Sequence, residues 1–215
     1  MIPVKPQPEP AEFQEQVRAK GERWLAEHSA GEPYPYWRGW CIQELGRRYK
    51  RICAYTCQWV PPGVGFATVD HFLPKSRRRE LAYDWSNYRF SCGRVNGRKG
   101  QVDGLLDPFL LIEGAFELDL SLMMVRVGET VPEVARGAHQ QTIDRLGLNE
   151  DDYLEYRTLT YCSYKAGEIR FLGLRRAQPF LAMELCRLGL LHPKDAHHTA
   201  AEVRAWLDAE VDTLP

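Results

Sequence analysis

The sequence lacks a long apolar segment and is poor in cysteine. None of its hydrophobic runs reaches the roughly 20 residues that a membrane-spanning helix needs. The first ten residues, MIPVKPQPEP, contain four prolines and no apolar stretch typical of a signal peptide. Six cysteines in 215 residues are too few for a disulfide-stapled scaffold. These absences argue against a membrane partner and a small secreted domain, and they lead us to expect a cytoplasmic protein with reduced thiols.

Net charge is also nearly absent. The formal value of −1, taken alone, argues against a nucleic-acid partner, but the charges are distributed unevenly along the chain. Between Leu45 and Gln101 there are twelve Lys or Arg residues and three acidic ones, a net charge of +9, whereas the rest of the chain has a net charge of −10. This division predicts one face that binds a polyanion and a separate acidic body. A solvated surface on which charges happen to cluster would give the same count.

Hydrophobic periodicity predicts a mainly helical chain with two short pairs of strands. Thr199 and Glu202 have the spacing of a capping box for the last helix. The expected elements, in chain order, are an extended arm (1–10), helices (11–29 and 37–49), strands (64–72 and 88–91) around a polar loop, a short helix (93–100), a hairpin (116–127) and four helices (131–147, 149–165, 176–190 and 199–213).

This order indicates an α+β fold with three parts. Residues 1–50 form an N-terminal arm and helices, residues 51–104 a central core, and residues 105–215 a mostly helical part. We expect the helical part to pack on the core, so that the chain forms one compact unit.

Four polar residues in the basic window are candidates for catalysis. Asp70 and His71 are adjacent at the end of a predicted strand, and Asn87 and Asn96 follow at intervals that return the chain to that end. A neutral imidazole can deprotonate water near pH 7, and a hard divalent cation held by oxygen ligands can offset charge on a phosphorane. Each residue alone is more often structural, as a strand-end histidine or a turn asparagine. Together they predict phosphodiester hydrolysis.

The order of these residues matches a known motif. The segments TVDHFLPKS, YDWSNYRFSC and GRVNGRKG resemble the motif of HNH endonucleases, a ββα-metal finger. The matching positions are Asp70-His71, Pro74-Lys75, Asn87, Asn96 and Lys99. A wider and less specific likeness includes Cys53-Ala54-Tyr55, Asp107-Pro108 and the segment TIDRLGLN over 142–149. In these features the chain resembles bacterial anti-phage defence HNH proteins of the Septu and retron-associated kind, some of which work beside an SMC-like ATPase.

The resemblance implies a ββα-metal HNH finger embedded in a mainly α-helical shell, and the activity of a metal-dependent DNA endonuclease in anti-phage defence. It implies that His71 is the general base and that Asn87 braces the loop that holds His71. Asp70 and Asn96 would bind one divalent cation, Mg²⁺ or Mn²⁺. Basic residues would contact the DNA backbone, namely Lys75, Arg77, Arg78, Arg94, Arg98 and Lys99. The implied partners are DNA and an ATPase encoded nearby.

The cysteines depart from the family pattern. Many HNH proteins hold a structural zinc ion through two Cys-x-x-Cys pairs. Here the first pair is Cys53-x-x-x-Cys57, and Cys92 is followed by Val95 where its partner thiolate would stand. Because three thiolates leave the tetrahedron incomplete, we expect buried free thiols and no structural zinc.

Two other functions fit the same residues. If the HNH motif is idle, the chain is a nucleic-acid-binding or assembly subunit. The chain could equally be an RNase, because phosphate contacts carry no information about the sugar. The acidic helical part, with aromatic residues such as Tyr34, Tyr36, Trp37 and Trp40, predicts docking of a partner or of a second copy of the chain.

Overall fold

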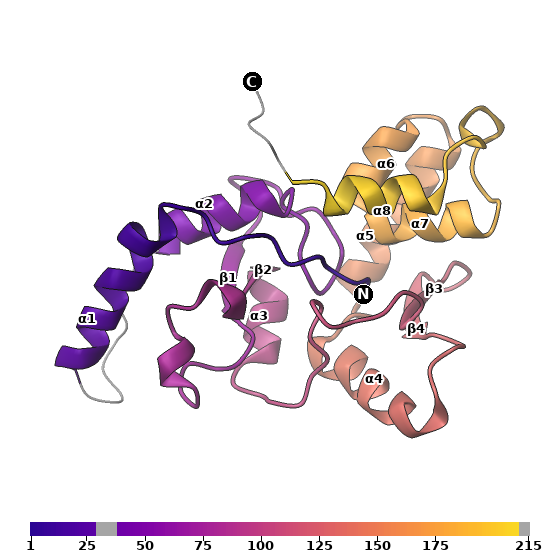
Figure 1. The fold of residues 1–215 in the computed structure, drawn as a ribbon. Helices are drawn as coiled ribbons and strands as arrows, with labels where there is room; N and C mark the ends of the chain where they lie inside the picture. The colour runs from indigo at the N-terminus through magenta and orange to yellow at the C-terminus, as the bar shows by residue number, and fades with distance from the viewer. Residues whose placement is uncertain (29–37, 211–215) are drawn as a thin grey trace.

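The computed structural model describes residues 1–28 and 38–210 and has a mixed α+β fold (Figure 1). There are two small two-stranded sheets, of which the first lies beside the N-terminal helices and the second beside the group of C-terminal helices (Figure 1). Three aromatic residues of the predicted docking surface, Tyr34, Tyr36 and Trp37, lie outside the described residues.

The N-terminal arm is extended, as predicted, and is held against distant parts of the chain. Residues 1–10 form no helix or strand. The Val4 amide donates to the Pro108 carbonyl (2.9 Å), and the indole N–H of Trp85 donates to the Gln7 carbonyl (2.9 Å). The helical elements that follow are η1 (Gln14–Arg18), α1 (Ala19–Glu27) and α2 (Arg38–Arg48).

Two antiparallel strands and a helix occupy the centre of the molecule. β1 (Ala67–His71) pairs with β2 (Tyr88–Cys92), and α3 (Gly93–Lys99) follows β2 directly and contacts both strands. The loop between the strands contains two short 3-10 turns, η2 (Arg79–Leu81) and η3 (Trp85–Asn87). The predicted order of strand, loop, strand and helix is therefore confirmed.

The first strand is shorter than predicted. It begins at Ala67 rather than at Val64, because the chain turns on itself just before it. The amides of Val64 and Gly65 donate to the carbonyls of Pro62 (3.0 Å) and Pro61 (3.0 Å). Backbone donors used in this way cannot take part in a strand ladder.

The remaining elements follow the predicted order, with one error. The predicted helix over 176–190 is two helices, and the first of them starts earlier, at Phe171. Pro179 lacks an N–H and disfavours a helical conformation of the preceding residue, and Gln178 accordingly adopts φ −142° and ψ 69°. The capping box between Thr199 and Glu202 is present. The elements are β3 (Phe116–Asp119), β4 (Met124–Val127), α4 (Glu133–Leu146), α5 (Asp151–Lys165), α6 (Phe171–Ala177), α7 (Pro179–Arg187), η4 (Pro193–Asp195) and α8 (Ala200–Asp208).

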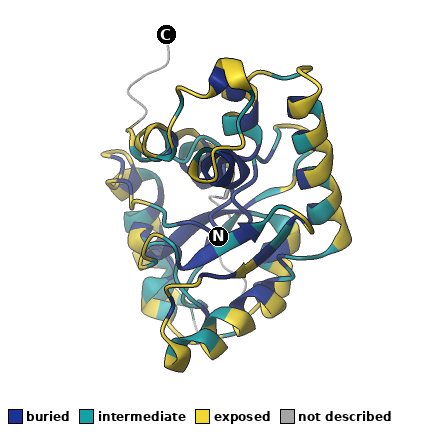
Figure 2. Ribbon diagram, turned by 90° about the vertical axis from the view of Figure 1, so that its right-hand side faces the viewer, coloured by how far each residue is buried: buried dark blue, intermediate teal, exposed yellow. Residues whose placement is uncertain are grey.

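The buried core includes residues from all three predicted parts of the chain. Phe13 of the N-terminal part, Phe90 of the centre and Leu181 of the C-terminal part belong to one cluster of buried apolar side chains. The central β-ribbon and the inner helical segments are buried, whereas the outer helix faces are exposed (Figure 2). Among the described residues, no helix has both the length and the apolar composition that crossing a membrane requires.

Candidate active site

The two candidate residues at the end of β1 point to opposite sides of the strand, as adjacent residues of a strand do. The Asp70 side chain contacts Tyr55 and Lys99. The His71 ring instead contacts the Ala82 carbonyl and the ring of Tyr88. The end of β1 therefore carries a carboxylate on one side and an imidazole on the other.

Asp70 lies in a closed polar cluster. Its side chain accepts a hydrogen bond from the Tyr55 hydroxyl at Oδ2 and one from the Lys99 ammonium at Oδ1 (3.0 Å). Lys99 Nζ also donates to the His71 carbonyl (2.9 Å). Asp70 is 2% exposed, and Tyr55 and Lys99 are 0% exposed. Burial and the nearby Asp70 charge raise the pKa of Tyr55 well above its usual value, so the phenol stays protonated and donates.

The hydrogen bond of His71 fixes its tautomer. Nε2 lies 2.8 Å from the Ala82 carbonyl oxygen, which can only accept, so Nε2 carries the proton. Nδ1 therefore holds the lone pair. Burial lowers the pKa of His71 to about 4, against the opposing effect of the hydrogen bond to Ala82. At neutral pH the imidazole is uncharged, and Nδ1 is the atom that can accept a proton.

Asn87 ties together the loop between the strands. Its Oδ1 accepts from the Leu73 amide (2.8 Å), and its Nδ2 donates to the carbonyls of Leu73 (3.0 Å) and Leu81 (3.2 Å). Leu81 immediately precedes Ala82, whose carbonyl holds His71. Asn87 thus joins two segments of the loop that carries the Ala82 carbonyl.

The amide orientation of Asn96 is fixed by its neighbours. The Thr68 hydroxyl donates its proton to the Ser91 carbonyl (3.0 Å) and is left only with acceptor capacity. Asn96 donates from Nδ2 to this hydroxyl (3.0 Å) and to the Val69 carbonyl (3.4 Å). A flipped amide would place two acceptors against one another. Asn96 Oδ1 is therefore the atom turned away from β1 and available as a ligand.

The predicted phosphate contacts divide into three groups: a partly buried lysine, four surface arginines and the fully buried Lys99. Lys75 is partly buried, which lowers the pKa of its ammonium group, whereas Arg77, Arg78, Arg94 and Arg98 lie at the surface. Each of these four arginines forms an ion pair with an acidic residue, and the acids are Asp103, Glu80, Glu150 and Asp152.

Lys99 differs from the other predicted phosphate contacts. It is buried and paired with Asp70, and this position is at odds with a contact to a phosphate. Acids outside the basic window, Glu150 and Asp152 on the α5 side, also cover part of the basic surface.

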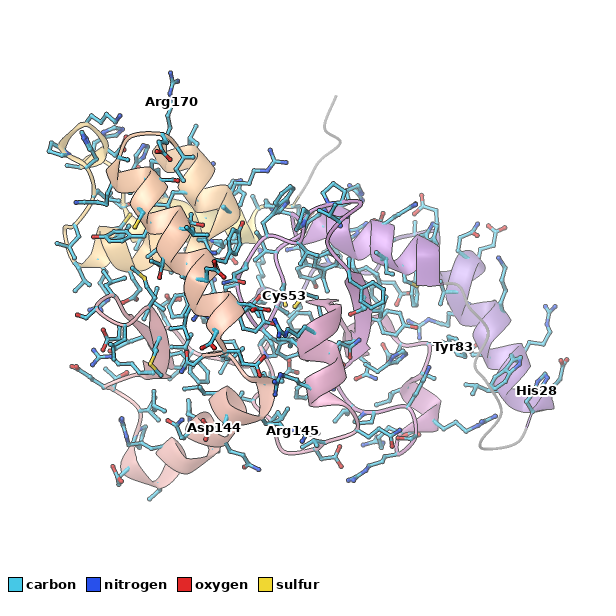
Figure 3. All side chains as sticks on the ribbon, turned by 180° about the vertical axis from the view of Figure 1, so that it is seen from behind. His28, Cys53, Tyr83, Asp144, Arg145 and Arg170 are labelled. Carbon is cyan, nitrogen blue, oxygen red and sulfur yellow. The ribbon has the colours of Figure 1, made fainter. Side chains whose placement is uncertain are left out.

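The three cysteines of the incomplete zinc set do not converge. Cys53 and Cys92 lie with their sulfur atoms 4.0 Å apart, and Cys53 is buried in the middle of the molecule (Figure 3). Cys57 accepts a hydrogen bond from the Ile2 amide (3.3 Å). Burial raises the pKa of the Cys53 thiol, but hydrogen bonds with Cys92 and Thr56 outweigh this effect and lower it below its usual value. Within residues 1–28 and 38–210, no three His, Cys, Asp or Glu side chains are grouped so that they could hold a metal ion.

Sequence reasoning missed two partners of this site. The sequence indicates Tyr55 only as part of a family likeness, because no local pattern shows that a tyrosine 15 residues from Asp70 will donate to it. Arg89 forms a paired hydrogen bond with Asp107 (2.9 and 2.6 Å) and lies over the Phe109 ring (3.5 Å to the centroid). The Asp107-Pro108 pair after the motif was the available signal for this contact.

Comparison with known proteins gives a short match. No family model matches the chain. Over 45 residues the chain is 40% identical to the Septu protein PtuB of Bacillus thuringiensis. These 45 residues make up 21% of this chain and 18% of that protein. The matched region is thus less than a fifth of the relative's length, and it relates a part of this chain to a part of that protein.

Proposed function

We propose that this chain is a metal-dependent HNH endonuclease that hydrolyses DNA phosphodiester bonds as an effector of anti-phage defence. The observation that carries the proposal is the strand–loop–strand–helix unit of β1, β2 and α3. It holds Asp70, His71, Asn87 and Asn96 in the order of the HNH motif, with His71 neutral and oriented by a backbone carbonyl. The alternative of an idle motif is favoured by Asp70, whose oxygens are held by Tyr55 and Lys99, whereas the contacts of His71, Asn87 and Asn96 suit their proposed roles.

His71 is the proposed general base. Nδ1 accepts a proton from the water that attacks phosphorus, while the Ala82 carbonyl holds the ring in place through Nε2. The proton converts the imidazole to an imidazolium, which the Ala82 carbonyl stabilises at the opposite nitrogen. A base whose pKa is about 4 is deprotonated at every physiological pH, although it is a weaker base than an unperturbed imidazole.

The donor atoms suit a hard divalent cation. Asp70 offers carboxylate oxygens and Asn96 offers Oδ1, and Mg²⁺ or Mn²⁺ typically binds to a few protein oxygens and completes its shell with water and substrate phosphate. When bound, such a cation neutralises charge on the phosphorane and on the leaving oxygen. In the chain as described, Lys99 holds one of the Asp70 oxygens.

The exposed arginines and Lys75 are the proposed contacts to the DNA backbone. An arginine that already pairs with a surface carboxylate can exchange that partner for a phosphate, because exposed ion pairs contribute little stability. The anti-phage role rests on the 40% identity over 45 residues with the Septu protein PtuB. We propose the product of a neighbouring ATPase gene as the protein partner.

The test is cleavage of supercoiled plasmid and of a matched RNA by the purified chain, with Mg²⁺, Mn²⁺ or EDTA, alone and with the product of the neighbouring gene. We expect nicked or linear DNA with either metal and intact DNA with EDTA. DNA that stays intact with metal and partner would contradict the proposal. Cleavage of the RNA but not of the plasmid would show that the substrate is RNA rather than DNA.

A further inference from the structure

We propose that Lys99 is an internal counter-ion that occupies Asp70 in the resting protein, and that a divalent cation binds only when Lys99 leaves, drawn away by a substrate phosphate. The proposal rests on the proposed function and concerns regulation of the same site. It couples metal binding to nucleic-acid binding, so that each strengthens the other.

The first observation is the completeness of the Lys99 site. The ammonium lies 3.0 Å from Asp70 Oδ1 and 2.9 Å from the His71 carbonyl oxygen, and it is 5.6 Å from the centre of the Phe72 ring. Two oxygen contacts and an aromatic ring form an environment for a cation. The position beside Asp70 is therefore filled by a cation that the chain itself supplies.

The second observation is that Lys99 and a metal compete for the same carboxylate. Mg²⁺ binds oxygen ligands at about 2.0–2.1 Å. With the ammonium 3.0 Å from Oδ1, a metal on Asp70 would lie within a few ångströms of a buried positive charge. In this buried place the metal ion and the Lys99 ammonium would each be attracted to Asp70 but would strongly repel one another. The Asp70 carboxylate can therefore bind only one of the two cations at a time. Tyr55, which is neutral, holds the other oxygen and does not have this effect.

The third observation is that Lys99 lies where it can change partners. It is the last residue of α3, followed by Gly100, which has a positive φ of 56°. Arg145 lies beside this end of the helix (Figure 3), with its guanidinium 3.5 Å from the Lys99 carbonyl. Arg98, the preceding residue, is 42% exposed. The side chains of Arg98 and Lys99 point in different directions, but a phosphate bound to Arg98 or to the exposed Arg145 would stand at the end of α3 that carries Lys99. The flexible lysine side chain can exchange a carboxylate for a phosphate.

The experiment measures Mn²⁺ affinity by electron paramagnetic resonance of the free ion, on wild type and on Lys99→Met, without DNA and with a short duplex at a concentration that saturates binding. Activity is not the readout. We expect Mn²⁺ to bind wild type at least tenfold more tightly with the duplex than without it. We expect Lys99→Met to bind Mn²⁺ at least tenfold more tightly than wild type without DNA, and to lose most of the effect of DNA.

Two controls separate competition from general damage. Lys99→Arg keeps the charge and should retain weak Mn²⁺ binding without DNA. If Lys99→Met is too unstable to titrate, the wild-type comparison with and without duplex decides, and equal affinities there overturn the proposal. Equal Mn²⁺ affinity of wild type and folded Lys99→Met overturns it as well. If wild type cleaves plasmid but its Mn²⁺ affinity is the same with and without DNA, the proposed nuclease function stands and only the role of Lys99 is wrong. If the Mn²⁺ affinities change as expected but no DNA is cleaved, the role of Lys99 stands and the nuclease function is wrong.

Discussion

Buried and exposed ion pairs have different roles in this molecule. In the centre, Asp70 pairs with Lys99 and Arg89 with Asp107, with side chains at most 11% exposed. On the outer side of the same unit, Arg94 and Arg98 pair with Glu150 while remaining 49% and 42% exposed. Buried charges without partners are costly, so the inner pairs fix the geometry of the site. The outer pairs are screened by water and can exchange a carboxylate for a phosphate.

The largest effect is expected from breaking an inner pair. Arg89→Met leaves Asp107 as an unpaired buried carboxylate and should reduce the free energy of unfolding by about 3–5 kcal/mol. Urea denaturation measures the loss. The matched control is Arg126→Met, which breaks an exposed pair with Glu117 and should cost less than about 1 kcal/mol. Equal losses in the two variants would contradict the distinction between inner and outer pairs.

Stability should also depend on pH through His71. Its folded-state pKa of about 4 lies below the ordinary 6.5, so the unfolded chain binds more protons between these values. The contribution of the neutral His71 side chain to the free energy of unfolding is fully present above pH 6.5 and is lost as the pH falls towards 4. Over this range the free energy of unfolding changes by at most about 1.4 kcal/mol per pH unit. Urea denaturation in EDTA measures this slope for wild type and for His71→Asn. A slope that is the same in both would show that His71 is not its source.

A smaller loss of stability is expected at Asn87. Asn87→Ala removes three hydrogen bonds that join η3 to Leu73 and Leu81, at roughly 0.5–1.5 kcal/mol each, so we expect a loss of about 2 kcal/mol. The same loop carries the Ala82 carbonyl, which orients His71. The rate of DNA cleavage by Asn87→Ala should therefore fall by more than the fraction of unfolded protein accounts for. Cleavage and thermal unfolding measured on the same preparation test this. Unchanged cleavage in the folded variant would show that Asn87 does not position His71.

The smallest effect on stability is expected at the outer pairs. Arg94→Ala and Arg98→Ala should each change the free energy of unfolding by less than about 1 kcal/mol. Each should weaken DNA binding and reduce the slope of log affinity against log salt by about 1. The control is Arg126→Ala, since Arg126 is as exposed as Arg94, at 49%, but lies outside the basic window. An equal change in DNA affinity for Arg126→Ala would show that the effect is one of net charge alone.

Local pattern predicted the elements well and their side-chain partners less well. The strands around Asp70 and Tyr88, the short helix from Gly93 and the capping box at Thr199 follow from alternation, turn residues and cap chemistry, all of which act over a few residues. The break at Pro179 is also a local effect, and the predicted single helix over 176–190 does not take it into account. The burial of Lys99 does not follow from local pattern, because a lysine near a helix end is ordinarily solvated. Its interior position is made favourable by distant partners, the Asp70 carboxylate and the His71 carbonyl.

The central claim is that His71 activates water for phosphodiester hydrolysis. The most direct measurement is the initial rate of plasmid cleavage in Mn²⁺ by wild type and by His71→Ala, at protein concentrations that bind the DNA equally. General base catalysis typically contributes about 10²–10⁴-fold, so we expect the variant to be at least about 100-fold slower with DNA binding retained. Rates within a few-fold of one another would contradict the claim.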